Sequence, residues 1–138
     1  MIHKEICTYE LCKLAKEKGF DLDCPMFYNP EGKLKYGWAY DPMNSGLDMR
    51  DMLCHNSKLP LGFGAECTAP TQSLLQRWLR EEKGLHISIP LHKGEYKYFW
   101  AIDSLNRKKK VDDIAYNLFD TYELALEDAI KFALKNLV

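Results

Sequence analysis

The stretch TAPTQSLLQRWLREEKGLHISIPLHKGEYKYFWAI, residues 68–102, carries the strongest local folding signals in the chain. In its first half, Leu75, Trp78 and Leu79 recur at helical spacing opposite a polar side. Gly84 supplies the left-handed residue that commonly follows the last turn of a helix. The pattern predicts an amphipathic helix that ends at Gly84.

After Gly84 the apolar period changes to two, with Ile87, Ile89 and Leu91 on one side. Pro90 has no N–H for a strand ladder, which predicts that this strand lies at an edge or is bulged. Residues 92–95 have turn-forming composition, so we expect a hairpin. The return strand is predicted to carry on one face Tyr96, Tyr98, Trp100 and Ile102.

The regions on either side of this stretch predict two more helices and a second hairpin. A helix over 9–18 is followed by Gly19, and a last helix follows an Asp120–Glu123 capping pattern. GKLKYGWAY, residues 32–40, resembles GEYKYFWAI, residues 94–102, which suggests an internal helix–hairpin repeat. We therefore predict an α+β fold of three helices packed on an antiparallel sheet of about four strands from two hairpins. Residues 41–67 show no periodicity and are predicted as a long irregular loop.

The composition is typical of a globular protein without bulk affinity for a charged partner. The chain has 138 residues, 46% hydrophobic and 28% charged, with 19 basic and 20 acidic side chains. This length fits one domain, over residues 1–138. Because no stretch is as apolar as a signal peptide or membrane span, we expect a cytoplasmic protein without membrane contact.

The cysteines give little support for disulfide, metal or thiol chemistry. They are odd in number, lack a C-x2-C pair, and are predicted to be reduced structural thiols: Cys7, Cys12, Cys24, Cys54 and Cys67. A soft metal site at Cys54, His55 and Cys67 lacks the close ligand pairs typical of zinc. A thiol nucleophile, Cys54 or Cys67, with His55, His86 or His92 as base has no specific spacing. We expect no cofactor, no metal and no enzymatic activity.

Nucleic-acid binding is the alternative with the most support from the residues. The run Arg107, Lys108, Lys109 and Lys110, extended by Arg77 and Arg80, is predicted to meet phosphates. Tyr96, Tyr98 and Trp100 would stack on bases if their face were open. From Pro70 onward the order of helix, strands and helix resembles the double-stranded-RNA-binding fold. The Gly-x-x-Lys-Lys feature of that family is missing, since Phe119-Asp120-Thr121 stands in its place.

Three segments together resemble a group of short uncharacterised proteins. These are APTQSLLQRWLRE, residues 69–81, LCKLAKEKGF, residues 11–20, and TYELALE, residues 121–127. The group is encoded by bacteriophages and by prophage or mobile elements of gut bacteria. The resemblance covers most of the chain and implies a phage-type accessory setting inside a bacterial host cell, with no known activity.

We therefore predict an interaction protein that works without catalysis and binds another protein or itself, for example as a homodimer. The alternatives are a nucleic-acid-binding protein and a protein that sequesters a small nucleotide, both using the same basic and aromatic residues. An aromatic-rich sheet with few helices to cover it favours the first hypothesis.

Overall fold

The computed structural model describes residues 5–36, 53–59, 64–105, 112–115 and 117–138. The fold divides into two compact units. Ile6–Pro70 is the N-terminal unit, and Thr71–Val138 together with Glu5 is the C-terminal unit. Each unit has its own strands and buried residues and is described by itself.

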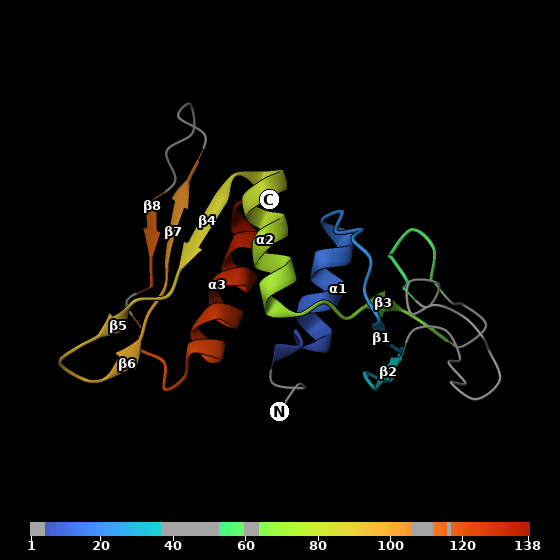
Figure 1. The fold of residues 1–138 in the computed structure, drawn as a ribbon, viewed down its shortest axis with the longest axis horizontal. Helices are drawn as coiled ribbons and strands as arrows, with labels where there is room; N and C mark the ends of the chain where they lie inside the picture. The colour runs from blue at the N-terminus through green and yellow to red at the C-terminus, as the bar shows by residue number, and fades with distance from the viewer. Residues whose placement is uncertain (1–4, 37–52, 60–63, 106–111, 116) are drawn as a thin grey trace. The chain divides into compact units, whose positions relative to one another are not determined.

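The C-terminal unit has the order of helix, strands and helix that the sequence predicts. It consists of α2 (Gln72–Lys83), β4 (Leu85–Ser88), β5 (Leu91–His92), β6 (Lys97–Tyr98), β7 (Ala101–Ser104), β8 (Asp112–Ile114) and α3 (Tyr122–Asn136). An antiparallel sheet has the order β4-β7-β8, and β5 pairs with β6. Both helices pack on one side of the β4-β7-β8 sheet (Figure 1).

β4, β5, β6 and β7 form one long hairpin that is interrupted at Pro90. The pairs of β4 with β7 and of β5 with β6 continue a single register. At the break the Phe99 N–H donates to the Pro90 carbonyl at 3.1 Å. Pro90 has no N–H to donate in return. β4 is an edge strand, as predicted. The N–H that Pro90 lacks would face Phe99 on the partner strand, however, and not the free edge of the sheet.

The core of the C-terminal unit lies between the two helices and the sheet. Gln72, which the helical pattern places on the polar side of α2, is nevertheless buried. Its Nε2 donates to the Glu123 carbonyl and to Glu127 Oε2, each at 2.9 Å, and so ties the start of α2 to α3. The apolar residues buried in this unit are Leu75, Trp78, Leu79, Leu85, Ile87, Trp100, Ile102, Ala125, Leu126, Ala129, Ile130, Ala133 and Leu134.

Both helices of this unit begin at a threonine. The Oγ1 atoms of Thr71 and Thr121 each accept the backbone N–H three residues further on, at 3.1 Å. α2 ends at Gly84, with φ 66, as the sequence predicts. Asp120, predicted as the cap of α3, lies one residue before the cap and forms an ion pair instead.

The N-terminal unit contains α1 (Tyr9–Glu17), β1 (Met26–Tyr28), β2 (Leu34–Tyr36) and β3 (Cys67–Thr68). Its antiparallel sheet has the order β2-β1-β3. After α1, Gly19 has φ 95, and the N–H of buried Phe20 donates to the Ala15 carbonyl at 3.0 Å. This is the Schellman ending that the Lys-Gly-Phe sequence predicts.

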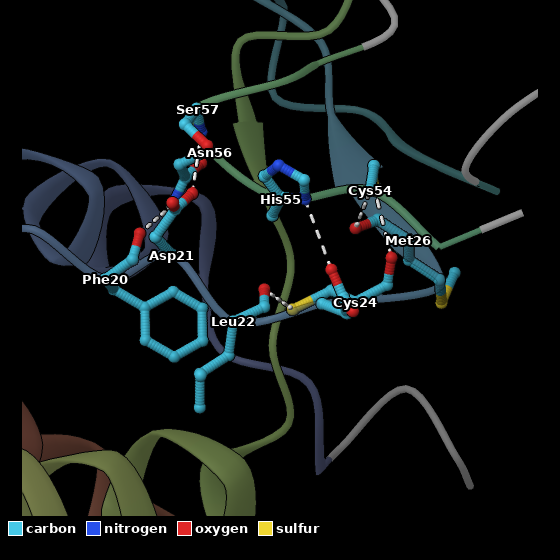
Figure 2. A network of polar contacts seen from close by, with 10 residues as sticks. Phe20, Asp21, Leu22, Cys24, Met26, Cys54, His55, Asn56 and Ser57 are labelled. Atoms are coloured by element: carbon cyan, nitrogen blue, oxygen red, sulfur yellow. Dashed lines mark hydrogen bonds and ion pairs between the residues drawn. The ribbon is translucent and has the colours of Figure 1, made fainter. Parts of the chain in front are cut away.

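Residues 53–59 form isolated bridges and a turn and are held by polar contacts (Figure 2). The Asn56 side chain donates to the Phe20 carbonyl at 2.7 Å and accepts the Thr68 N–H at 2.9 Å. The Ser57 N–H donates to Asp21 Oδ1 at 2.7 Å. These bonds join the segment both to the end of α1 and to β3, and they replace the ladder bonds of regular structure.

Part of the predicted loop 41–67 pairs as strand. Cys24 and Cys54 exchange backbone hydrogen bonds of 2.7 and 2.9 Å, and Cys67 belongs to β3. Residues 37–52 and 60–63 lie outside the described residues. The prediction of an irregular loop is therefore corrected at Cys54 and Cys67.

The α+β class, the three helices and the antiparallel pairing are confirmed. The strands of the described residues lie in three sheets, where the sequence predicts one sheet from two hairpins. Each hairpin takes its third strand from its own unit, β3 beside β1 and β8 beside β7. Both units do have a helix followed by a hairpin, as the suggested repeat requires. Of the helices in the described ranges, none has both the length and the apolar character needed to cross a bilayer.

Candidate interaction surface

The hairpin of β5 and β6, which we call the arm, extends beyond β4 and β7 (Figure 1). Its loop is residues 93–96, between the paired residues His92 and Lys97. The Glu95 N–H donates to the His92 carbonyl at 3.3 Å, and Tyr96 follows with φ 53. The sequence predicts Tyr96 in the return strand. It lies in the loop instead, because the chain leaves the tight turn through a left-handed residue.

The arm is joined to the start of α3 by three kinds of contact. Tyr98 and Phe119 exchange backbone hydrogen bonds of 2.8 and 2.7 Å. Lys97 Nζ lies 3.4 Å from Asp120 Oδ1. The Tyr98 ring meets the Tyr122 ring edge to face, with centroids 6.1 Å apart. The arm is therefore fixed to the helix and does not stand as an isolated two-stranded ribbon, which would be marginally stable.

Apolar side chains of the arm and of the start of α3 are exposed. Leu91 pairs directly with Tyr98, so both are on the face that Tyr122 contacts. Leu91 is 45% exposed, Tyr122 42%, and Tyr96 at the tip 79%. We call Leu91, Tyr96, Tyr98 and Tyr122 the arm surface. Apolar side chains that are exposed as a group, unlike single ones, indicate an interaction site.

The basic residues proposed for nucleic acid are described only in part. Arg107, Lys108, Lys109 and Lys110 lie outside the described residues. Arg77 and Arg80 are exposed on α2. Arg77 Nε lies 3.9 Å from Glu81 Oε2, a surface pair that contributes little to stability. The exposed side of α2 thus carries acidic as well as basic groups.

The aromatic residues proposed for base stacking are mostly inaccessible to a ligand. Trp100 is buried, its Nε1 donates to Asp128 Oδ2 at 2.8 Å, and its ring lies 5.0 Å from that of Phe132. Tyr98 is half-buried against Tyr122. Of the three residues predicted to stack, only Tyr96 presents most of its ring to solvent.

The thiols of the N-terminal unit are poorly suited to nucleophilic chemistry. Burial raises the pKa of Cys24 to about 12, of Cys54 to about 11 and of Cys67 to about 12. The Cys54 thiol donates to the Cys24 carbonyl at 3.3 Å. His55 Nδ1 lies 3.2 Å from Asp23 Oδ1, so its partner is a carboxylate and not a thiol. Because the thiolate is the reactive form, these surroundings favour an inert structural role.

The part of the chain that the structure describes contains no cluster of metal-binding side chains. There, no three side chains of His, Cys, Asp or Glu gather closely enough to hold an ion. Cys54, His55 and Cys67, the proposed ligands, belong to the N-terminal unit. His86 and His92 are exposed on β4 and β5 of the C-terminal unit.

Two members of the arm surface were not singled out by sequence reasoning. Leu91 fits the apolar side of a strand, and Tyr122 fits the apolar side of α3, so both patterns predict core residues. Each is the first residue of its element and is only partly covered. The signals for this were Pro90 immediately before Leu91 and the cap immediately before Tyr122.

Comparison with known proteins adds no assignment: no family model matches the chain, and no curated protein or solved structure is significantly similar to it.

Proposed function

We propose that this chain is a non-catalytic interaction protein, of phage-type accessory character, that binds the surface of another protein or of a second copy through the arm surface. The observation that carries the proposal is the exposure of Leu91 and Tyr96 on a hairpin fixed to α3, and of Tyr122 at the start of that helix. Tyrosine is a frequent anchor in protein interfaces because its large ring buries apolar area and its hydroxyl can form a hydrogen bond.

The anchoring of the arm favours binding energetically. A flexible hairpin would lose conformational freedom on association, and this loss would subtract from the affinity. Here the backbone bonds between Tyr98 and Phe119 and the contact of the Tyr98 ring with the Tyr122 ring hold the arm before a partner arrives. The surface is thus preorganised for contact.

Photo-crosslinking tests the proposal. A benzophenone amino acid placed at position 96, in bacterial cells that carry the protein, is expected to capture a protein on irradiation. The same probe at position 36 is the matched control, since Tyr36 is 73% exposed and Tyr96 79% exposed. We expect an adduct from position 96 and little from position 36. Equal adducts from both positions, or none from position 96, would contradict the proposal.

A second candidate function is nucleic-acid binding, which is supported by the exposure of Arg77 and Arg80 on α2. If it holds, the affinity for a short RNA duplex falls steeply with salt. The Arg77→Ala/Arg80→Ala variant would then lower the slope of log K against log salt by about 1 for each phosphate that the arginines had neutralised. Replacing Arg107, Lys108, Lys109 and Lys110 by Ala tests the basic run in the same way. Absence of binding at low salt would remove this candidate.

A further inference from the structure

Tyr96 occupies a backbone conformation that disfavours folding, while its side chain adds little to the fold. Among the described residues it is the one non-glycine residue with positive φ, at 53°. Left-handed backbone crowds the Cβ of any residue but glycine, and an aromatic side chain is rarely found there. The ring is 79% exposed, so burial does not compensate for the strain. Strained residues that the fold itself does not need indicate a functional constraint.

The loop beside Tyr96 carries one positive and one negative side chain, so it is complementary in charge to a second copy of itself. Lys93 and Glu95 flank Gly94, and both are exposed. Neither is in an ion pair with another residue of the described ranges. If two arms meet about a two-fold axis near Gly94, Lys93 of each copy faces Glu95 of the other. A two-fold interface uses one patch twice and therefore requires self-complementarity of this kind.

We infer that the occupant of the arm surface is a second copy of this chain, in a symmetric dimer whose two arms meet at their tips, with the Tyr96 rings on either side of the two-fold axis. This inference rests on the proposed function and specifies its partner. The rings and the Leu91 side chains supply the apolar area, and the crossed pairs of Lys93 and Glu95 set the orientation.

Charge reversal tests the two-fold arrangement by sedimentation of the full chain. Lys93→Glu alone and Glu95→Lys alone each place like charges across the axis and should weaken the dimer by about tenfold or more. A one-to-one mixture of these two variants should restore it. In the mixture one copy is acidic at both positions and the other is basic at both. A wild-type chain that stays monomeric at high concentration, or a mixture that associates no better than the single variants, overturns the inference.

The Tyr96→Gly variant adds an independent readout. It removes both the ring and the left-handed strain, so we expect loss of the dimer together with a melting temperature, measured in dilute solution, that is a few degrees higher. Tyr36→Ala removes an equally exposed ring from the N-terminal unit and should leave the dimer intact. Retention of the dimer in Tyr96→Gly would refute the role of Tyr96.

The crosslinking result separates the two proposals. An adduct from position 96 with twice the mass of the chain supports both. If sedimentation gives a monomer and position 96 captures a different protein, the second-copy inference fails while the proposed function stands. If position 96 captures nothing, both fail.

Discussion

Raising the pH from 9 to 11 is expected to unfold the N-terminal unit and to leave the C-terminal unit folded. Unfolded thiols ionise near their ordinary pKa of 9.0, while burial holds the pKa of Cys24, Cys54 and Cys67 at about 12, 11 and 12. Above pH 9 the unfolded state therefore loses protons that the folded state keeps. The free energy of unfolding is unaffected by these thiols below that pH and falls above it, until the pH passes the folded pKa values.

The size of this effect is large for a small unit. Each thiol removes at most about 1.4 kcal/mol of stability per pH unit in this window, so the three together remove at most about 4 kcal/mol per pH unit. A whole domain typically has about 5–15 kcal/mol. All five cysteines lie within Ile6–Pro70, so thiol ionisation does not act on the C-terminal unit.

Urea unfolding at a series of pH values on both sides of 9 measures this slope. The matched controls are Cys24→Ala and Cys54→Ala, made singly. Each lowers the stability at every pH, because it leaves a cavity, but should also reduce the alkaline slope by about 1.4 kcal/mol per pH unit. Because parent and variants share every other side chain, the difference in slope reports the substituted thiol. A slope unchanged by both substitutions would show that these thiols do not couple folding to pH.

The Trp100→Ala variant is expected to unfold the C-terminal unit or to leave it only marginally stable. The indole is buried, packs on Phe132 and donates to Asp128 Oδ2 at 2.8 Å. Removing a buried aromatic side chain lowers the free energy of unfolding by about 3–5 kcal/mol, because apolar packing is lost and a cavity remains. The Asp128 carboxylate also loses its donor, which adds to the cost.

Thermal and urea unfolding of Trp100→Ala, Trp100→Phe and Tyr96→Ala separates the contribution of apolar packing from that of the hydrogen bond. Trp100→Phe keeps most of the apolar volume and loses the donor, so we expect a loss of about 1–2 kcal/mol. Tyr96→Ala removes an exposed ring of the same hairpin and should change stability by less than about 0.5 kcal/mol. A Trp100→Ala protein as stable as the Tyr96→Ala protein would mean that Trp100 is not part of the core.

Helix boundaries were predictable because their signals are local. Gly19 with Phe20, and Gly84, each determine a helix ending within a few residues of sequence. The α+β class follows from the change of period from 3.6 to 2 after Gly84. Gln72 was misplaced because helical spacing alone cannot show that a polar side chain has a buried partner, here the Glu123 carbonyl.

The arrangement of the strands was less predictable because it depends on distant partners. The backbone pair of Cys24 and Cys54 joins residues 30 positions apart, and no local pattern indicates that Cys54 is the partner of Cys24. For the candidate surface, the aromatic residues were recognised but their exposure was not. Alternation predicts that Tyr96 and Trp100 share an environment, whereas one left-handed residue at Tyr96 separates an exposed ring from a buried one.

Near the two ends of the N-terminal unit, the Cys7 N–H donates to the Pro70 carbonyl at 3.0 Å. The two ends of this unit are therefore adjacent, as in a domain inserted into another domain. Glu5, just before it, groups with the C-terminal unit, just after it. Deleting residues 6–70 would therefore leave only a short gap to join. We expect the shortened chain still to form the C-terminal sheet, both its helices and the arm.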